Sequence, residues 1–284
     1  MRVASVRGPL KQLLRERRAA IDPVSAGFPP RIPGPGRRAA GLSQEQMDEL
    51  LNRAPGTYNR FENGQLANPG NEFLTSVAKV LRLNEQEWTF LWRLARRENP
   101  PFTLHRDSGM SVPGVWQRVV DQITGALAYI NDAEWNVLAH NLEYRHLFPG
   151  GRPPANTMRW MLLDPEARSE VLIDWETRWA PLVMPQLRHA VEMRPHNPAL
   201  ARMEAEVLKD PVAGPLYRET ATSPVPYPDG SERPVNHAVH GPGWVTTCVA
   251  EPVTSPGARV MLLLYTPGAS LTERDPVLTA PLRS

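Results

Sequence analysis

Residues 41–64 read GLSQEQMDELLNRAPGTYNRFENG, and this stretch decides the fold of the first third of the chain. Its first half predicts a helix, because Ser43 and Gln46 have the spacing of a capping box. Met47 and Leu50 follow at helical spacing. The residues after this helix carry no apolar period, so a tight turn is expected there.

The second half of the stretch predicts another short helix, over residues 55–62. Pro55 suits a first helical turn, and Asn63-Gly64 is a typical helix end. Tyr58 and Phe61 lie three residues apart and are expected to face inward, with polar side chains outward. Two short helices around a tight turn are the pattern of a helix-turn-helix, whose second helix enters the DNA major groove.

Further helices are expected on both sides of this stretch. Apolar spacing predicts helices over residues 8–20, from about 71 to 81, and over 85–97. Residues 21–40 hold five Pro and three Gly and are expected to form an irregular connection. The first third of the chain is therefore predicted to be an all-helical bundle.

Charge is unevenly distributed along the chain. Residues 1–111 hold 17 basic and 11 acidic residues, while the remainder holds 15 basic and 19 acidic residues. A basic first third, with an excess of six positive charges, fits a part that meets phosphate. A random distribution of surface charge is the other explanation.

Length and composition favour two domains. A chain of 284 residues with 41% hydrophobic residues can bury more than one core. Its single cysteine, Cys248, excludes a disulfide framework and fits a reducing cytoplasm. The longest apolar run, residues 260–265, is far too short to span a membrane, and no signal-peptide pattern is found. We therefore expect a cytoplasmic protein without a membrane partner.

The rest of the chain has a mixed pattern that favours an α+β domain. Residues 98–114 contain Pro and Gly and are expected to form a boundary. Helical spacing follows from residue 115. Strands are predicted at residues 126–132, 134–141, 243–252 and 258–268, with helices between the second and third.

The helix-turn-helix resembles the Cro/lambda-repressor type, the XRE family. In that family a Glu-x-Gly follows the recognition helix, and a helix ending in Ala-x-x-Leu packs behind it. Glu62, Gly64, Ala78 and Leu81 match this pattern. The resemblance implies a DNA-binding bundle.

Other motifs resemble the actinobacterial subgroup whose helix-turn-helix is fused to an MmyB-like ligand-binding domain. The RR-x-x-GL signature at residues 37–42 and the Tyr-x-Arg-aromatic-Glu string at 58–62 carry this resemblance. In the second part, Asn141, the Asn-led segment 156–168 and the helix pair within 174–209 match the domain's pattern. The resemblance covers residues 8–269 and implies a PAS-like fold, a small sheet with helices on one side around a pocket.

Four segments are expected on this basis. Residues 1–100 are predicted to form the helix-turn-helix DNA-binding domain and residues 101–111 a linker. Residues 112–270 are predicted to form the MmyB-like, PAS-like ligand-binding domain, and residues 271–284 a tail. The predicted fold class is α+β, an all-α bundle followed by a PAS-like domain.

Two residues of the second helix are candidates to read bases. Arg60 can pair bidentately with guanine, and Asn59 can pair with adenine. The candidates for phosphate contact are Ser43, Gln44, Thr57 and, in the Pro/Gly loop, Arg38. The partner is expected to be a double-stranded DNA operator, bound by a homodimer.

Pro55 and Gly56 depart from the family pattern, because neither side chain can read a base edge. The alternative hypothesis is therefore a protein-interaction module with a degenerate helix-turn-helix. Arg38 also has an alternative explanation, as part of an exposed basic loop.

Large apolar side chains gather in the middle of the second part, as ordinary core or as the lining of a pocket. The residues are Trp135, Trp160, Met161, Trp175, Trp179, Leu182, Met184 and Leu187. The resemblance implies that they surround a fatty-acid-like or other apolar small molecule. Candidate polar anchors are Asn141, Arg188 and His240, although Arg188 also fits an ordinary surface residue of a helix.

No catalytic or metal-binding pattern is found in the sequence. The seven His are scattered, and His140 and His146 are six residues apart, the wrong interval for metal ligands on one helical face. Cys248 lies in a β-rich segment and is expected to be a core or sheet residue and not a nucleophile. We therefore expect neither an enzyme nor a bound cofactor.

Overall fold

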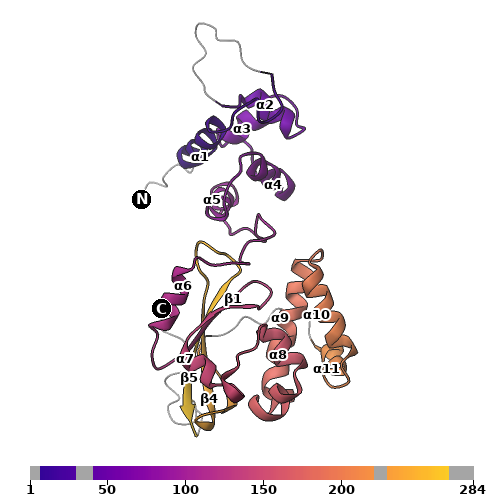
Figure 1. The fold of residues 1–284 in the computed structure, drawn as a ribbon. Coiled ribbons are helices and arrows are strands. Elements are labelled where there is room, and N and C mark those ends of the chain that lie inside the picture. The colour runs from indigo at the N-terminus through magenta and orange to yellow at the C-terminus, as the bar shows by residue number, and fades with distance from the viewer. Residues whose placement is uncertain (1–6, 30–40, 221–228, 269–284) are drawn as a thin grey trace, which may run out of the picture. The chain divides into compact units, whose positions relative to one another are not determined.

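The computed structural model describes residues 7–29, 41–220 and 229–268. The chain forms two compact units, Met1–Arg106 and Asp107–Ser284, which are coloured along the chain in Figure 1. The division between them falls within residues 101–111, the segment that the sequence marks as a linker. None of the helices in the described ranges has the length and apolar character needed to cross a membrane.

The first unit is an all-helical bundle, as predicted. Its buried residues include Leu14, Met47, Leu74 and Trp88, which form one hydrophobic core. The expected capping box is confirmed, because Gln46 N donates to the Ser43 hydroxyl and Ser43 N donates to Gln46 Oε1. The helices are α1 (Arg7–Ala19), α2 (Gln44–Leu50), α3 (Thr57–Glu62), α4 (Asn71–Val80) and α5 (Glu85–Arg96).

The second helix of the helix-turn-helix begins later than the sequence predicted. Its first residue is Thr57, so Pro55 lies in the preceding turn and not in the helix. Gly56 occupies the N-cap position with φ 82°, a left-handed conformation that glycine adopts without a steric penalty. Gly56 therefore lies outside the helical turns and does not weaken the interior of α3.

A second glycine brings the chain back against α1. Gly41 has φ 88°, and a Cβ at this position would lie 2.4 Å from the Arg18 carbonyl oxygen and 2.5 Å from Ala19 Cα. The next residue, Leu42, is fully buried and donates its amide to the same Arg18 carbonyl. The Gly-Leu of the RR-x-x-GL signature therefore has a packing role, whereas Arg37 and Arg38 lie outside the described residues.

The second unit contains an antiparallel five-stranded sheet in the order β2-β1-β5-β4-β3. Strand β1 pairs with β5 from Leu127 opposite Leu263 to Asn131 opposite Arg259. The strands are β1 (Leu127–Asn131), β2 (Val137–His140), β3 (Ser231–His237), β4 (Gly241–Ala250) and β5 (Arg259–Pro267). This arrangement agrees with the predicted α+β class.

Helices cover both faces of this sheet. Leu127 and Tyr129 of β1 face the larger core, while Ala128 and Ile130 face a smaller core that includes Val120 of α6. Figure 1 shows α6 on the opposite side of the sheet from α8 to α11. The expectation of helices on one side alone is thus wrong for α6. The helical segments of the unit are α6 (Val115–Asp121), α7 (Leu142–His146), η1 (Pro149–Gly151), α8 (Thr157–Leu163), η2 (Ala167–Val171), η3 (Trp175–Trp179), α9 (Ala180–Met193), α10 (Pro198–Lys209) and α11 (Ala213–Glu219).

Strand β3 and helix α11 were not predicted from the sequence. Strand β3 reads SERPVNH, and its proline and charged residues break the usual strand pattern. Pro234 is tolerated because β3 is the last strand of the sheet, where a missing amide costs little. Helix α11 is short and contains Gly214 and Pro215, which mask its apolar face in the sequence.

Candidate nucleic-acid interface and small-molecule site

The exposed side of α3 presents two of the predicted base-reading residues. Asn59 and Arg60 are exposed, while Tyr58 and Phe61 are buried against the bundle. Among the described residues, the Arg60 guanidinium has no hydrogen bond or ion pair, so it is free to contact a ligand. The Asn59 side-chain oxygen accepts from Asn63 Nδ2, so that its amide group is partly engaged.

The buried end of α3 is fixed to α2 by a carboxylate. Asp48 is only 3% exposed, and its two side-chain oxygens accept from Gly56 N and Tyr58 N, each at 2.7 Å. The first amides of a helix have no partner within the helix, so this carboxylate supplies a cap from the preceding helix. A negative charge at the start of a helix is also favourable to the helix dipole.

The far end of α3 is tied to α1 by a buried ion pair. Glu62 is 2% exposed and meets Arg18, with Nε–Oε2 at 3.0 Å and Nη2–Oε1 at 3.2 Å. Gln44 Nε2 donates to the same carboxylate at 3.0 Å. The pKa of the neighbouring Tyr58 phenol is raised, first by burial and then by the Glu62 charge. The helix is therefore held at both ends by partners outside it.

The candidates for phosphate contact differ in whether their side chains are already hydrogen-bonded within the protein. The Ser43 hydroxyl is engaged by Gln46 N, and Gln44 is engaged by Glu62. Thr57 is half-buried at the first position of α3, and Arg38 lies outside the described residues. Arg53, which the sequence did not single out, is exposed in the turn before α3 with its guanidinium 5.9 Å from the Phe73 ring centre.

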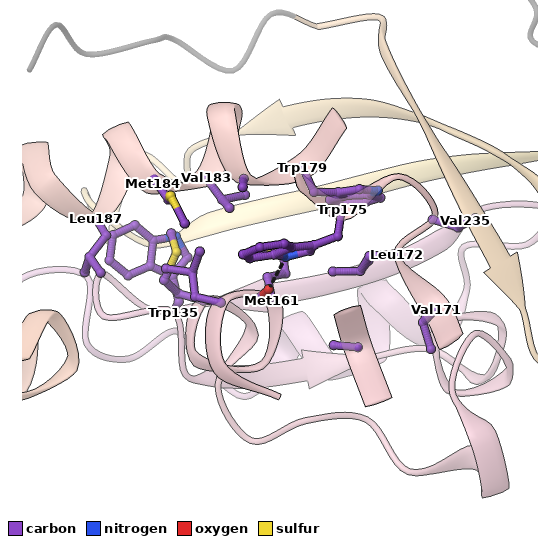
Figure 2. Close-up of a cluster of buried hydrophobic side chains, with 14 of the residues drawn as sticks. Trp135, Met161, Val171, Leu172, Trp175, Trp179, Val183, Met184, Leu187 and Val235 are labelled. Atoms are coloured by element: carbon purple, nitrogen blue, oxygen red, sulfur yellow. Dashed lines mark hydrogen bonds between the residues drawn. The ribbon is translucent and has the colours of Figure 1, made fainter. Parts of the chain in front are cut away.

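The apolar residues proposed for a ligand site lie together in the second unit. All of them except Leu182 belong to, or pack against, one large cluster of buried side chains, part of which is drawn in Figure 2. Trp160 is partly buried at its margin. The sequence-predicted members that are fully inside the cluster are Trp135, Met161, Trp175, Trp179, Met184 and Leu187.

The three central indoles differ in their hydrogen bonds. Trp175 Nε1 donates to the Met161 carbonyl at 2.7 Å, the dashed line in Figure 2, and Trp179 Nε1 donates to the Pro234 carbonyl at 3.0 Å. Trp135 Nε1 is buried and has no hydrogen-bond partner among the described residues. Since buried polar groups are nearly always paired, Trp135 is the unusual member.

The proposed polar anchor Asn141 is fully used by the backbone around it. Its side chain accepts from Ala128 N and Tyr144 N, and donates to Ile123 O and Ala126 O. These four bonds cap α7 and join it to the strand β1 region. Its position therefore favours a structural role.

Of the other two proposed anchors, Arg188 is hydrogen-bonded to the backbone and His240 is exposed. Arg188, on α9, donates to the carbonyls of Tyr217 and Thr220 and lies with its guanidinium 4.7 Å from the Tyr217 ring centre. His240 is exposed in the turn between β3 and β4. Asn141, Arg188 and His240 each bond to other neighbours, and no hydrogen bond between described residues joins them.

His237 is a buried histidine beside this turn. Its Nδ1 accepts from Val239 N at 3.2 Å and from His240 N at 3.3 Å, and its ring centre is 4.6 Å from that of His240. Burial, followed by the charges of His240 and His146, lowers the pKa of His237 to about 4. Within the ranges that the structure covers, no group of three or more His, Cys, Asp or Glu could hold a metal ion.

Comparison with known families decides the identity of the chain. A family model described as the MmyB-like transcription regulator ligand binding domain matches residues 112–275, more than half of the chain. The chain belongs to the MmyB-like transcription regulators. A helix-turn-helix domain model matches residues 12–89. No curated protein matches the chain.

The two matches confirm the resemblance to an XRE-like helix-turn-helix regulator with an MmyB-like domain. They support a ligand-responsive, DNA-binding regulator, and both describe domains of transcription regulation and not of enzymes. In this MmyB-like regulator, α3 belongs to the matched helix-turn-helix, and the buried cluster belongs to the matched ligand-binding domain.

Several important residues of this MmyB-like regulator were not found from the sequence. Asp48 and Arg18 bond to α3 from 8 to 44 residues away in the chain, so no local motif marks them. Trp135 was expected to line the site, but its positive φ of 66° and its unpaired indole nitrogen were not foreseen. The sequence around Trp135 shows only that it follows Asp-Ala-Glu and lies two residues before a strand, which does not predict its backbone conformation.

Proposed function

We propose that this regulator binds a DNA operator by placing α3 in the major groove, with Arg60 reading guanine and Asn59 assisting. The exposed Arg60 guanidinium carries the proposal, because it projects from a helix whose two ends are fixed by Asp48 and by the Arg18–Glu62 pair. An arginine without an internal partner, on a helix held at both ends, is suited to bidentate base contact. Arg53 and Thr57 flank the helix start and are suited to phosphate oxygens.

The second domain is proposed to bind an apolar small molecule, such as a fatty acid, within the buried cluster around Trp175. The cluster offers large apolar side chains, the usual lining of small-molecule sites. Ligand binding would then favour one arrangement of a homodimer, and DNA binding would be linked to that preference.

The alternative of a protein-interaction module loses its main support. It was based on Pro55 and Gly56 at the start of the recognition helix, and both residues precede α3. The positions on the helix itself carry Asn59 and Arg60, which can read bases.

DNA binding can be tested by selecting duplexes from a random library with the full-length protein and measuring affinity for the selected sequence. Arg60→Ala should weaken specific binding by about 1–3 kcal/mol and relax the preference at one base position. Arg15→Ala removes an exposed positive charge from α1 and is the matched control. If Arg60→Ala and the parent select and bind the same sequence equally well, Arg60 does not read a base.

Salt dependence separates DNA binding from a protein interface. Affinity for DNA should fall steeply with salt concentration, because phosphate contacts release counterions. Native mass spectrometry of the purified protein, followed by denaturation, would give the oligomeric state and release any bound molecule. An apolar species on a dimer would support the sensor proposal, and a monomer would contradict the dimer.

A further inference from the structure

The side chains of Asn59 and Asn63 are paired along the recognition helix. Asn59 is the third residue of α3, and Asn63 is the C-cap, about one helical turn further on. Asn59 is exposed and Asn63 is half-buried. Residues four apart on a helix lie on the same side of it, so their side chains can meet. The pair therefore lies beside the place from which Asn59 would contact a base.

The backbone fixes which way the Asn63 amide points. Asn63 Nδ2 donates to the main-chain carbonyl of Asn59 at 2.9 Å, and Asn63 N donates to the same carbonyl at 3.0 Å. A carbonyl oxygen only accepts hydrogen bonds, so the side-chain atom that meets it must be the nitrogen of Asn63. The usual ambiguity between the two ends of an amide is thereby removed for this residue.

The same NH2 group sets the orientation of the Asn59 amide. Asn63 Nδ2 also donates to Asn59 Oδ1. Since the donor is fixed, the Asn59 atom that accepts from it must be the oxygen. Asn59 Nδ2 has no hydrogen-bond partner among the residues that the structure describes. Asn59 therefore offers a free donor to a ligand, while its acceptor is directed at Asn63.

Neighbouring charges leave this pair undisturbed. Glu62, the acid next to Asn63, accepts from Arg18 Nε and from Gln44 Nε2 at 3.0 Å each, so its carboxylate is already engaged by other donors. Gly64 follows with φ 65° and ends the helix, which keeps Asn63 at the C-cap.

The orientation matters because the two ends of an asparagine amide read different base edges. An asparagine that reads adenine uses both ends, since its oxygen accepts from N6 and its nitrogen donates to N7. Guanine presents two acceptors, N7 and O6, and needs only donors. For the adenine pair, the oxygen and the nitrogen must both face one base edge. With its oxygen directed at Asn63, Asn59 is suited to guanine and not to adenine.

We propose that Asn63 is a positioning residue that determines specificity: it holds the Asn59 amide with its NH2 group toward the operator, so that Asn59 selects guanine. The inference rests on the proposed function, that α3 enters the major groove. Asn63 acts through Asn59 and does not itself contact a base. A hydrogen bond between side chains at the surface is weak in water, but it strengthens where water is excluded, as in an occupied groove.

The test is the base preference of the full-length protein and its variants. Duplexes are selected from a random library by the parent protein, and the base that Asn59 contacts is the position where Asn59→Ala loses its preference. Affinities are then measured for duplexes that carry each base in turn at that position. The parent should bind the guanine duplex more tightly than the adenine duplex by about fivefold or more.

Two substitutions of Asn63 remove the donor. Asn63→Ala frees both ends of the Asn59 amide, and Asn63→Asp keeps the shape of the side chain but offers only acceptors. Both should raise the ratio of adenine affinity to guanine affinity by about fivefold or more. This ratio is the readout, because the added negative charge of Asn63→Asp weakens binding to every duplex. In an Asn59→Ala background, Asn63→Ala should leave the ratio unchanged.

The matched control is Gln65→Ala. Gln65 is an exposed amide two residues after Asn63, and its side chain has no hydrogen bond within the described part of the chain. This variant should keep the parent's ratio of adenine affinity to guanine affinity.

The outcomes separate the role of Asn63 from the proposed function. A parent that prefers adenine at the position of Asn59, or a ratio that both substitutions of Asn63 leave unchanged, overturns the positioning role and leaves base reading by α3 in place. A ratio that Asn63→Ala changes even in the Asn59→Ala background means that Asn63 reads the base directly, which also overturns it. A parent that selects no sequence overturns both the positioning role and the proposed function.

Discussion

Asp48 in α2 accepts a hydrogen bond from the backbone amide of Tyr58 in α3, at 2.7 Å. The same carboxylate accepts from Gly56 N, so one buried side chain sets the start of the recognition helix. The helix is only six residues long, and so short a helix is not stable by itself in water. Its position therefore depends on contacts of this kind.

Loss of this cap should destabilise the helix-turn-helix. Asp48→Ala leaves two amides without an acceptor, and we expect the free energy of unfolding to fall by about 2 kcal/mol. Asp48→Asn keeps one acceptor oxygen and should cost less. Urea unfolding of the full-length protein measures both, with Glu49→Ala, an exposed acid on the same helix, as the control. A value for Asp48→Ala equal to the control would show that the cap contributes nothing.

Gly41 should be intolerant of any side chain. A Cβ there would lie within 2.5 Å of three backbone atoms of α1, and backbone atoms cannot move aside as a flexible side chain can. The positive φ adds about 1–2 kcal/mol for an L-residue. We expect Gly41→Ala to destabilise the first unit by roughly 3 kcal/mol or more. Gly70→Ala is the control, since that position has open space and a φ of −67°. Similar unfolding curves for the two variants would contradict this account.

The fold of the first unit was largely predictable because its signals are local. The capping box at Ser43 and the helix end at Asn63-Gly64 both depend on neighbours within a few residues. The start of α3 was misplaced because the cap comes from Asp48 in another helix, and a sequence pattern cannot show which distant carboxylate reaches an amide.

The stability of the second unit should depend on pH through His237. Its pKa is lowered to about 4 from the ordinary value of 6.5, so the unfolded chain binds a proton at a pH where the folded chain does not. As the pH falls from about 6.5 to about 4, this residue should remove on the order of 2–3 kcal/mol of stability, and nothing further below that range.

The histidine can be isolated by substitution. His237→Asn offers a side-chain oxygen to the amides of Val239 and His240 but does not titrate, so this part of the pH dependence should disappear. His196→Asn, at an exposed position, should leave the pH dependence as it is. Urea unfolding at fixed pH values between 4 and 7.5 is the measurement. An unchanged slope in His237→Asn would assign the effect to other groups.

Trp175 is expected to matter for both stability and ligand content. Trp175→Ala removes a large buried side chain and leaves the Met161 carbonyl without its donor, so about 3–5 kcal/mol should be lost. The amount of apolar molecule that copurifies should fall as well. Trp244→Ala removes a half-buried indole outside the cluster and should have smaller effects. An unchanged ligand content in folded Trp175→Ala would remove this residue from the proposed site.

The candidate ligand site was less predictable than the fold. The burial of the tryptophans could be predicted from the sequence, because large apolar side chains near the middle of a domain are usually buried. The polar anchors could not, since an asparagine such as Asn141 shows its role only when the carbonyls around it are known.

Strand β3 has a consequence for self-association. At Pro234 the strand has no N–H, and its carbonyl is already bonded to Trp179 Nε1. Two residues further along, the Asn236 side chain donates to the Glu170 carbonyl of η2. The opposite border of the sheet, β2, is only four residues long. Neither border therefore offers a long unbroken row of free backbone N–H and C=O groups. Pairing with a strand of another molecule, and aggregation by such pairing, is disfavoured at both borders. A homodimer is therefore expected to use side-chain contacts and not strand addition at these two borders.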